Sequence, residues 1–102
     1  MPTKKNLDKL IQEATIDCYD EGECLSGFYT ILEENIQFPF PAIVIGEEVE
    51  VVGVEWADNG IKAQCHRKHK SYSVNIVDIE YNSNIVLGAE WINAYKKWIG
   101  RQ

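Results

Sequence analysis

The apolar residues in the first third of the chain recur every three to four positions, the period of an α-helix with one buried face. Two runs share this phase: Leu7, Leu10, Ile11, Ala14 and Cys18, then Leu25, Phe28, Tyr29, Leu32 and Ile36. Gly22 lies between them and costs about 1 kcal/mol in a helix interior, so the pattern favours two helices broken near Gly22 over one long helix. Pro39 and Pro41 force the residues before them into extended conformations, so the helical region must end before Phe38. Asn35 is the residue at which we expect the helix to end. We therefore expect a helical arm over residues 1–37.

The middle of the chain alternates apolar and polar residues, which is the two-residue period of half-buried β-strands. The segments that carry this pattern are 49–56, 61–66 and 71–76, and a short apolar run at 42–45 precedes them. The phase slips beside Gly53, as it does at a β-bulge in a curled sheet. Asp58-Asn59-Gly60 is a hairpin signal because Asn-Gly readily takes left-handed turn conformations. We expect a bent antiparallel β-meander over residues 42–79, with the architecture of small SH3- or Tudor-like barrels.

The end of the chain returns to a helical pattern over residues 89–100. One apolar stripe contains Trp91, Ile92, Tyr95, Trp98 and Ile99. Glu90 lies near its start and basic residues lie near its end, as the helix dipole favours. The stripe is typical of core packing rather than of a binding surface. Because the chain has 102 residues and neither repeats nor a low-complexity linker, its elements are expected to pack as one α+β domain.

Acidic residues are concentrated in the first part of the chain. Residues 1–60 hold 13 acidic residues and three lysines, a balance of −10, whereas residues 61–102 hold three acidic and seven basic residues, a balance of +4. Negative potential repels phosphate backbones and attracts cations, so we expect no nucleic-acid partner. No apolar run approaches the roughly 18 residues of a membrane span. Since the amino terminus also lacks the apolar core of a signal peptide, we expect a cytoplasmic protein without a membrane partner.

The three cysteines suggest the same compartment, because an odd number cannot form a closed disulfide framework within one chain. A zinc site combining Cys18 and Cys24 with the segment 65–69 is disfavoured by poor ligand spacing. Cys65 falls on the apolar phase of its strand and is expected to be buried. The sequence contains no Gly-rich phosphate loop and no Ser-His-Asp set, so we expect no enzymatic activity.

Two short blocks are the candidate cation ligands. The first contains Asp17, Asp20, Glu21 and Glu23, and the second contains Glu33, Glu34 and Asn35. On a helix the first block would bring like charges onto one face, a repulsion that a bound cation relieves. The second block falls where the helical region ends and the last backbone carbonyls lack partners. Carboxylates, an amide oxygen and backbone carbonyls are the ligands that Ca²⁺ requires, although the sequence has no EF-hand loop.

The remaining charged segments are interpreted as solvated. A third acidic group contains Glu47, Glu48, Glu50 and Glu55, and Glu48 and Glu50 alternate with apolar residues along a predicted strand. The basic turn at 67–70 is either a solvated hairpin or a contact for an acidic partner, including the acidic part of a second copy of the chain. These segments support an alternative function: a small acidic interaction module that meets a basic protein partner and binds no specific ion. The sequence leaves the oligomeric state open.

A family resemblance is carried by several segments with joint spacing. These are Cys18-Tyr19-Asp20-Glu21-Gly22-Glu23, then Gly27-Phe28-Tyr29, then Leu32-Glu33-Glu34-Asn35-Ile36-Gln37-Phe38-Pro39-Phe40-Pro41-Ala42, then Gly46-Glu47-Glu48-Val49-Glu50-Val51-Val52-Gly53, and more loosely Gly88-Ala89-Glu90-Trp91-Ile92. Together they resemble the calcium-binding CcbP family. The chain departs from the family pattern at Gly22 and Cys24, where relatives often carry further acidic or polar residues, and at Glu34, where some carry Asp.

The resemblance implies a small non-enzymatic protein that binds Ca²⁺ through clustered carboxylates, as a buffer or a sensor. Carried over onto this sequence, it implies metal ligands at Asp20, Glu21, Glu23, Glu33, Glu34 and Asn35. Glu34 is the residue that we expect to contribute most.

Overall fold

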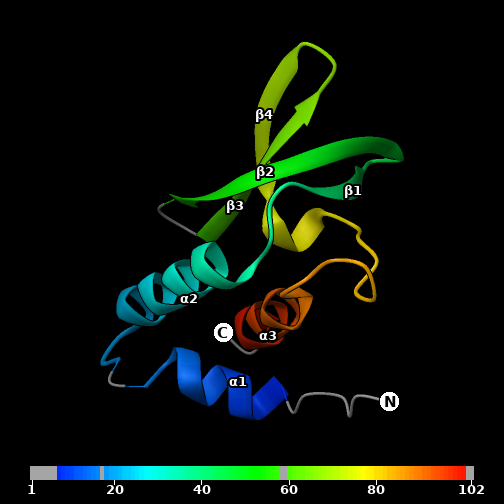
Figure 1. Cartoon of the computed structure of the whole chain (residues 1–102). Helices are drawn as coiled ribbons and strands as arrows, with labels where there is room; N and C mark the ends of the chain where they lie inside the picture. The colour runs from blue at the N-terminus through cyan, green and yellow to red at the C-terminus, as the bar shows by residue number, and fades with distance from the viewer. Residues whose placement is uncertain (1–6, 17, 58–59, 101–102) are drawn as a thin grey trace.

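The computed structural model describes residues 7–16, 18–57 and 60–100. Its elements in chain order are α1 (Leu7–Ala14), α2 (Glu21–Asn35), β1 (Phe40–Val44), β2 (Glu47–Ala57), β3 (Gly60–Arg67), β4 (Lys70–Asn75), the 3₁₀-helix η1 (Ile76–Asp78) and α3 (Ala89–Gly100). Helices precede and follow one antiparallel sheet (Figure 1), which confirms the predicted α+β class. No helix in the described ranges is long and apolar enough to cross a membrane.

The helical arm consists of two helices, but the break precedes Gly22. α1 ends at Ala14 and α2 begins at Glu21, so Gly22 lies inside the first turn of α2. Asp20 is the physical reason, because its extended backbone (φ −148°, ψ 174°) and its side chain cap the helix that follows. At the other end α2 stops at Asn35, the predicted terminator, and Ile36 is already extended.

The four strands form a meander in the order β1-β2-β3-β4. The register between β2 and β3 shifts between Val51 and Gly53, which confirms the predicted bulge. The expected turn at 58–60 lies partly outside the described residues, and Gly60 itself pairs with Ala57 at the start of β3.

The sheet stays open, so the expected SH3- or Tudor-like barrel is not closed. Closure would require the outer edge of β1 to pair with β4. Instead, Ile43 of β1 exchanges two backbone hydrogen bonds with Glu80, at 2.8 and 2.9 Å. The chain therefore covers this edge with the segment that follows η1.

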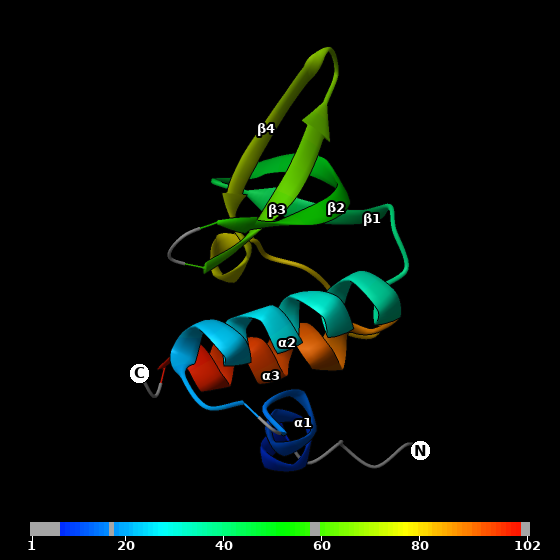
Figure 2. The same cartoon turned by 90° about the vertical axis from the view of Figure 1, so that its left-hand side faces the viewer.

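The helices form layers below the sheet. α2 and α3 lie side by side under the strands, and α1 packs below them (Figure 2). Phe28 of α2 is fully buried between Tyr95 and Trp98 of α3, with ring centroids 5.5 and 5.2 Å away. The Tyr95 hydroxyl accepts a hydrogen bond from the Ile61 N–H at 3.2 Å, which joins α3 to β3. The predicted apolar stripe of α3 therefore serves core packing.

Candidate metal centre

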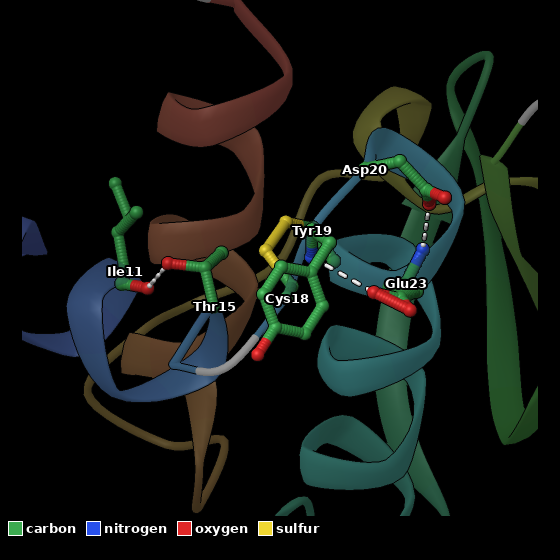
Figure 3. The surroundings of a disulfide bond; sticks show 7 residues. Ile11, Thr15, Cys18, Tyr19, Asp20 and Glu23 are labelled. Atoms are coloured by element: carbon green, nitrogen blue, oxygen red, sulfur yellow. Dashed lines mark hydrogen bonds between the residues drawn. A yellow bond between two sulfur atoms is a disulfide. The ribbon is translucent and has the colours of Figure 1, made fainter.

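The first acidic block lies at the N-terminus of α2 and caps it. Asp20 Oδ1 accepts a hydrogen bond from the Glu23 N–H at 2.8 Å, and Glu23 Oε1 accepts one from the Tyr19 N–H at 2.8 Å (Figure 3). Glu21 is the first residue of the helix and is exposed. Each acid therefore sits where a helix favours negative charge: at the cap or in the first turn.

This arrangement corrects the spacing argument for the first block. Asp20 precedes the helix instead of lying on one of its faces, and Asp17 falls outside the described residues. The positive end of the helix dipole already stabilises these carboxylates and opposes a cation placed beside them. Helix capping is thus sufficient to explain why Asp20 and Glu23 are acidic.

Replacing Asp20 with alanine removes this cap and is expected to lower the free energy of unfolding by about 1 kcal/mol. Urea denaturation followed by far-ultraviolet circular dichroism measures the change. Glu48→Ala is a matched control, because Glu48 is exposed on β2, and its effect should stay within about 0.5 kcal/mol. Equal stabilities of Asp20→Ala and the parent protein would contradict the capping role.

The second block lies at the C-terminal end of α2, and all three of its side chains are exposed. Glu33 accepts a hydrogen bond from the Tyr29 hydroxyl at 3.1 Å. The Asn35 amide nitrogen donates to the Ile31 carbonyl at 2.9 Å, so Oδ1 is the atom this amide offers to a cation. Glu34 extends from the same turn. Carboxylate, amide and carbonyl oxygens are therefore present in the last turn of the helix.

The electrostatics of this end favour a cation. The C-terminus of a helix carries the negative end of its dipole, and α2 has no basic residue in its last turn. The hydrogen bond to Glu33 raises the pKa of the Tyr29 hydroxyl, and slight burial and the charges of Glu33 and Glu55 act in the same direction. Negative potential therefore accumulates beside the second block without a basic side chain of α2 to offset it.

The two blocks cannot share one coordination shell. Glu21 and Glu34 are 13 residues apart on one continuous helix, which corresponds to about 20 Å at 1.5 Å per residue. Within the described ranges, no three His, Cys, Asp or Glu side chains are grouped closely enough to hold a metal ion. An ion bound here would complete its shell with backbone carbonyls and water, as Ca²⁺ commonly does.

The third acidic group follows the solvent side of β2, as the sequence predicted. Its members are Glu47, Glu48, Glu50 and Glu55. Glu47 pairs with Arg67 at 3.5 Å. Glu55 accepts hydrogen bonds from Ser73 at 2.6 Å and from Gln64 at 3.3 Å, and these bonds lower the pKa of its carboxyl group. Two of these acids thus already have protein partners on the strand surface.

The cysteines are paired in a way that the sequence did not predict. Cys18 and Cys24 form a disulfide with their Cα atoms 5.3 Å apart, which removes both thiolates from any zinc site. Cys65 is a buried free thiol, as expected, and burial raises its pKa.

Sequence reasoning also missed two neighbours of the second block. Tyr29 precedes Glu33 by four residues, a helical spacing that could have indicated their contact. Gly88 lies against the Asn35 carbonyl although 53 residues separate them, and no local pattern signals such a contact. The Gln37 N–H donates to the Leu87 carbonyl at 3.1 Å, so the segment before α3 closes over the end of α2.

Comparisons with known proteins agree with this architecture. A family model named Calci_bind_CcbP, described as calcium binding, matches residues 8–99. The fold is similar to that in "The crystal structure of Anabaena CcbP", with a TM-score of 0.70 and 19% sequence identity, over 97% of this chain and 95% of that chain. The comparison with curated proteins gives no match.

Proposed function

This chain belongs to the calcium-binding CcbP family, and from that premise we propose that it is a non-enzymatic calcium buffer or sensor whose main site is the second acidic block. Glu33, Glu34 and Asn35 would supply the side-chain oxygens. Carbonyls of the last turn of α2 would complete part of the shell. The observation that carries this proposal is the combination of exposed oxygen ligands with a helix C-terminus that has no basic residue in its last turn.

Calcium would act on this block by relieving repulsion. Glu33 and Glu34 are adjacent carboxylates at the negative end of a helix dipole, so their charges disfavour one another until a cation arrives. The affinity would be modest, because the side chains are exposed and no compact loop holds them in place. Glu34 would contribute most, since Glu33 and Asn35 already bind Tyr29 and Ile31.

The first block has a subordinate part in this proposal. Asp20 and Glu23 each have one carboxylate oxygen engaged in the cap of α2. Together with Glu21 they would take a second, weaker ion or attract cations without ordering them. The cytoplasmic location and a basic protein partner expected from the sequence stay predictions.

Isothermal titration of the metal-free protein with Ca²⁺, at physiological salt with Mg²⁺ present, tests the function. We expect saturable heat and a melting temperature that rises with calcium concentration, because a ligand of the native state stabilises it by mass action. Absence of both signals would overturn the calcium proposal.

Glu34→Gln tests the site and is expected to weaken calcium binding about tenfold, the equivalent of losing about 1.4 kcal/mol of binding free energy. Glu21→Gln and Glu50→Gln make the same charge change at the first block and on β2, and should alter the affinity by less than about threefold. Normal binding by Glu34→Gln would refute this site and leave the function standing. A larger loss in Glu21→Gln would move the main site to the first block.

A further inference from the structure

The Cys18–Cys24 disulfide closes a short ring around the start of α2. The ring contains the capping residue Asp20 and its partner Glu23, and Figure 3 shows it fastening the segment before the helix to the first turns. Capping motifs often place an apolar contact between the residue before the cap and the fourth helical residue. Here a covalent bond joins nearly the same positions. The disulfide therefore fixes the direction in which the chain enters α2 from α1.

The position of α1 depends on that entry. α1 has only eight residues, and helices so short are unstable in water without packing. It is held by its buried face of Leu10, Ile11 and Ala14 and by an exposed ion pair between Asp8 and Lys97 at 3.2 Å. Exposed ion pairs contribute little. Packing of its buried face, rather than its own helical stability, therefore holds α1 in place.

The packing of α1 against α2 depends on the absence of a side chain at Gly27. The Ala14 carbonyl approaches Gly27 so closely that a Cβ at position 27 would overlap it. Contact of this kind tolerates little displacement of α1 relative to α2. The disulfide restrains residues 18–24, at the α2 end of the connection between the two helices.

Cys18 is the more exposed partner of the disulfide. Cys18 is half-buried, whereas Cys24 is 8% exposed. The neighbouring Ile16 and Tyr19 are 71% and 88% exposed, so the pair lies at the protein surface on the Cys18 side. Exchange at a disulfide depends on such access.

We infer that Cys18 and Cys24 form a reversible thiol–disulfide site, and that its reduction by a dithiol loosens the α1 arm. One thiolate of the dithiol attacks Cys18 Sγ, the bond between the two cysteines breaks, and Cys24 leaves as a thiolate that takes up a proton. The second thiol of the dithiol then attacks the first sulfur of the same dithiol, which is bonded to Cys18 Sγ in the mixed disulfide. Cys18 is released as a thiol. Two electrons and two protons pass from the dithiol, which becomes a cyclic disulfide.

The inference goes beyond calcium binding and does not rest on it. The cysteine pair lies at the N-terminal end of α2 and the proposed calcium site at its C-terminal end. Cys24 and Glu34 are 10 residues apart on this helix, which corresponds to about 15 Å. Reduction should therefore leave the calcium affinity of the main site, Glu33, Glu34 and Asn35, within about twofold while it loosens α1. Loss of calcium binding in both forms would contradict only the calcium proposal.

The experiment uses the full chain and dithiothreitol as the dithiol. Alkylation and mass spectrometry should count one free thiol before reduction and three after it, under conditions in which the protein stays folded. The melting temperature should fall by roughly 10 °C, as expected for opening a short cross-linked ring in a domain of this size. Amide hydrogen exchange in residues 10–14 should accelerate by roughly tenfold while exchange in β2 and β3 stays unchanged.

Two variants complete the design. The double variant Cys18→Ser/Cys24→Ser should behave as the reduced protein does, and reduction of the parent protein gives the same information if this variant fails to fold. Cys65→Ala keeps the pair and should respond to dithiothreitol as the parent does, since Cys65 lies in β3. The inference is overturned by three free thiols before reduction, by a disulfide that resists dithiothreitol until the protein unfolds, or by unchanged exchange in α1.

Discussion

Replacing Gly88 with alanine is expected to lower the free energy of unfolding by about 3–4 kcal/mol, because two costs combine at this position. Gly88 has a φ of +90°, which L-residues rarely adopt, and a Cβ built there would overlap the Asn35 carbonyl oxygen. It would also lie 2.8 Å from the Ile36 Cα, so backbone rather than a flexible side chain must move. Urea denaturation measures the loss.

Gly46→Ala separates the two costs. Gly46 also has a positive φ, +76°, but no atom lies within 4 Å of the position that its Cβ would take. It should therefore lose only the conformational part, about 1 kcal/mol. Equal losses in the two variants would contradict the close approach of Gly88 to the end of α2. The Gly88 variant should also bind calcium more weakly, because the displaced backbone belongs to the proposed site.

Local patterns predicted the elements of this fold well where one physical signal dominated. The stripe of apolar residues in α3 and the alternation in β3 depend on neighbours in sequence, so their period is enough to assign them. Gly53 marked the bulge for the same reason. The start of α2 was displaced because the N-cap of Asp20 outweighed the glycine penalty at Gly22. Side-chain capping has to be weighed against propensity before a helix boundary is assigned.

The open sheet and the disulfide depend on contacts that no local pattern encodes. Whether β1 pairs with β4 or with Glu80 is decided by the path of the chain after η1. The pairing of Cys18 with Cys24 depends on how the chain enters α2 through the extended Asp20, which leaves their Cα atoms 5.3 Å apart. The odd number of cysteines argued against a disulfide framework. Three cysteines can nevertheless form one disulfide between near neighbours in sequence and leave one free thiol.

The candidate site was predictable in composition and not in arrangement. Both acidic blocks were named from the sequence, and the second was already expected at a helix end, but the position of the first at the N-cap of the same helix was not predicted. Their difference comes from the helix itself, because one block faces the positive end of the α2 dipole and the other faces the negative end. Once the helix boundaries are known, an acidic side chain has a capping role at Asp20 and a proposed cation-binding role at Glu34.

The second large effect is expected at Phe28, where replacement by alanine should lower the free energy of unfolding by about 3–5 kcal/mol. Phe28 is fully buried and contacts Tyr95 and Trp98 with its ring. Removing the ring leaves a cavity between α2 and α3, and the backbones on both sides are held by the sheet and cannot close it completely. Because the Tyr95 hydroxyl accepts a hydrogen bond from Ile61 of β3, a shift of Tyr95 into the cavity would also weaken the contact of α3 with the sheet.

Tyr29→Ala is the matched control for this variant, since Tyr29 is the next residue of α2. Its ring is half-buried and stacks on Trp56 at 6.2 Å, where solvent fills the space that the ring leaves. A loss of about 1 kcal/mol is expected there. Urea denaturation monitored by tryptophan fluorescence compares the two, and an unchanged m value shows that the denatured state is the same. If Phe28→Ala proved no more destabilising than Tyr29→Ala, the aromatic cluster would not be the centre of this core, and the seat of α2 on α3 would have to lie elsewhere.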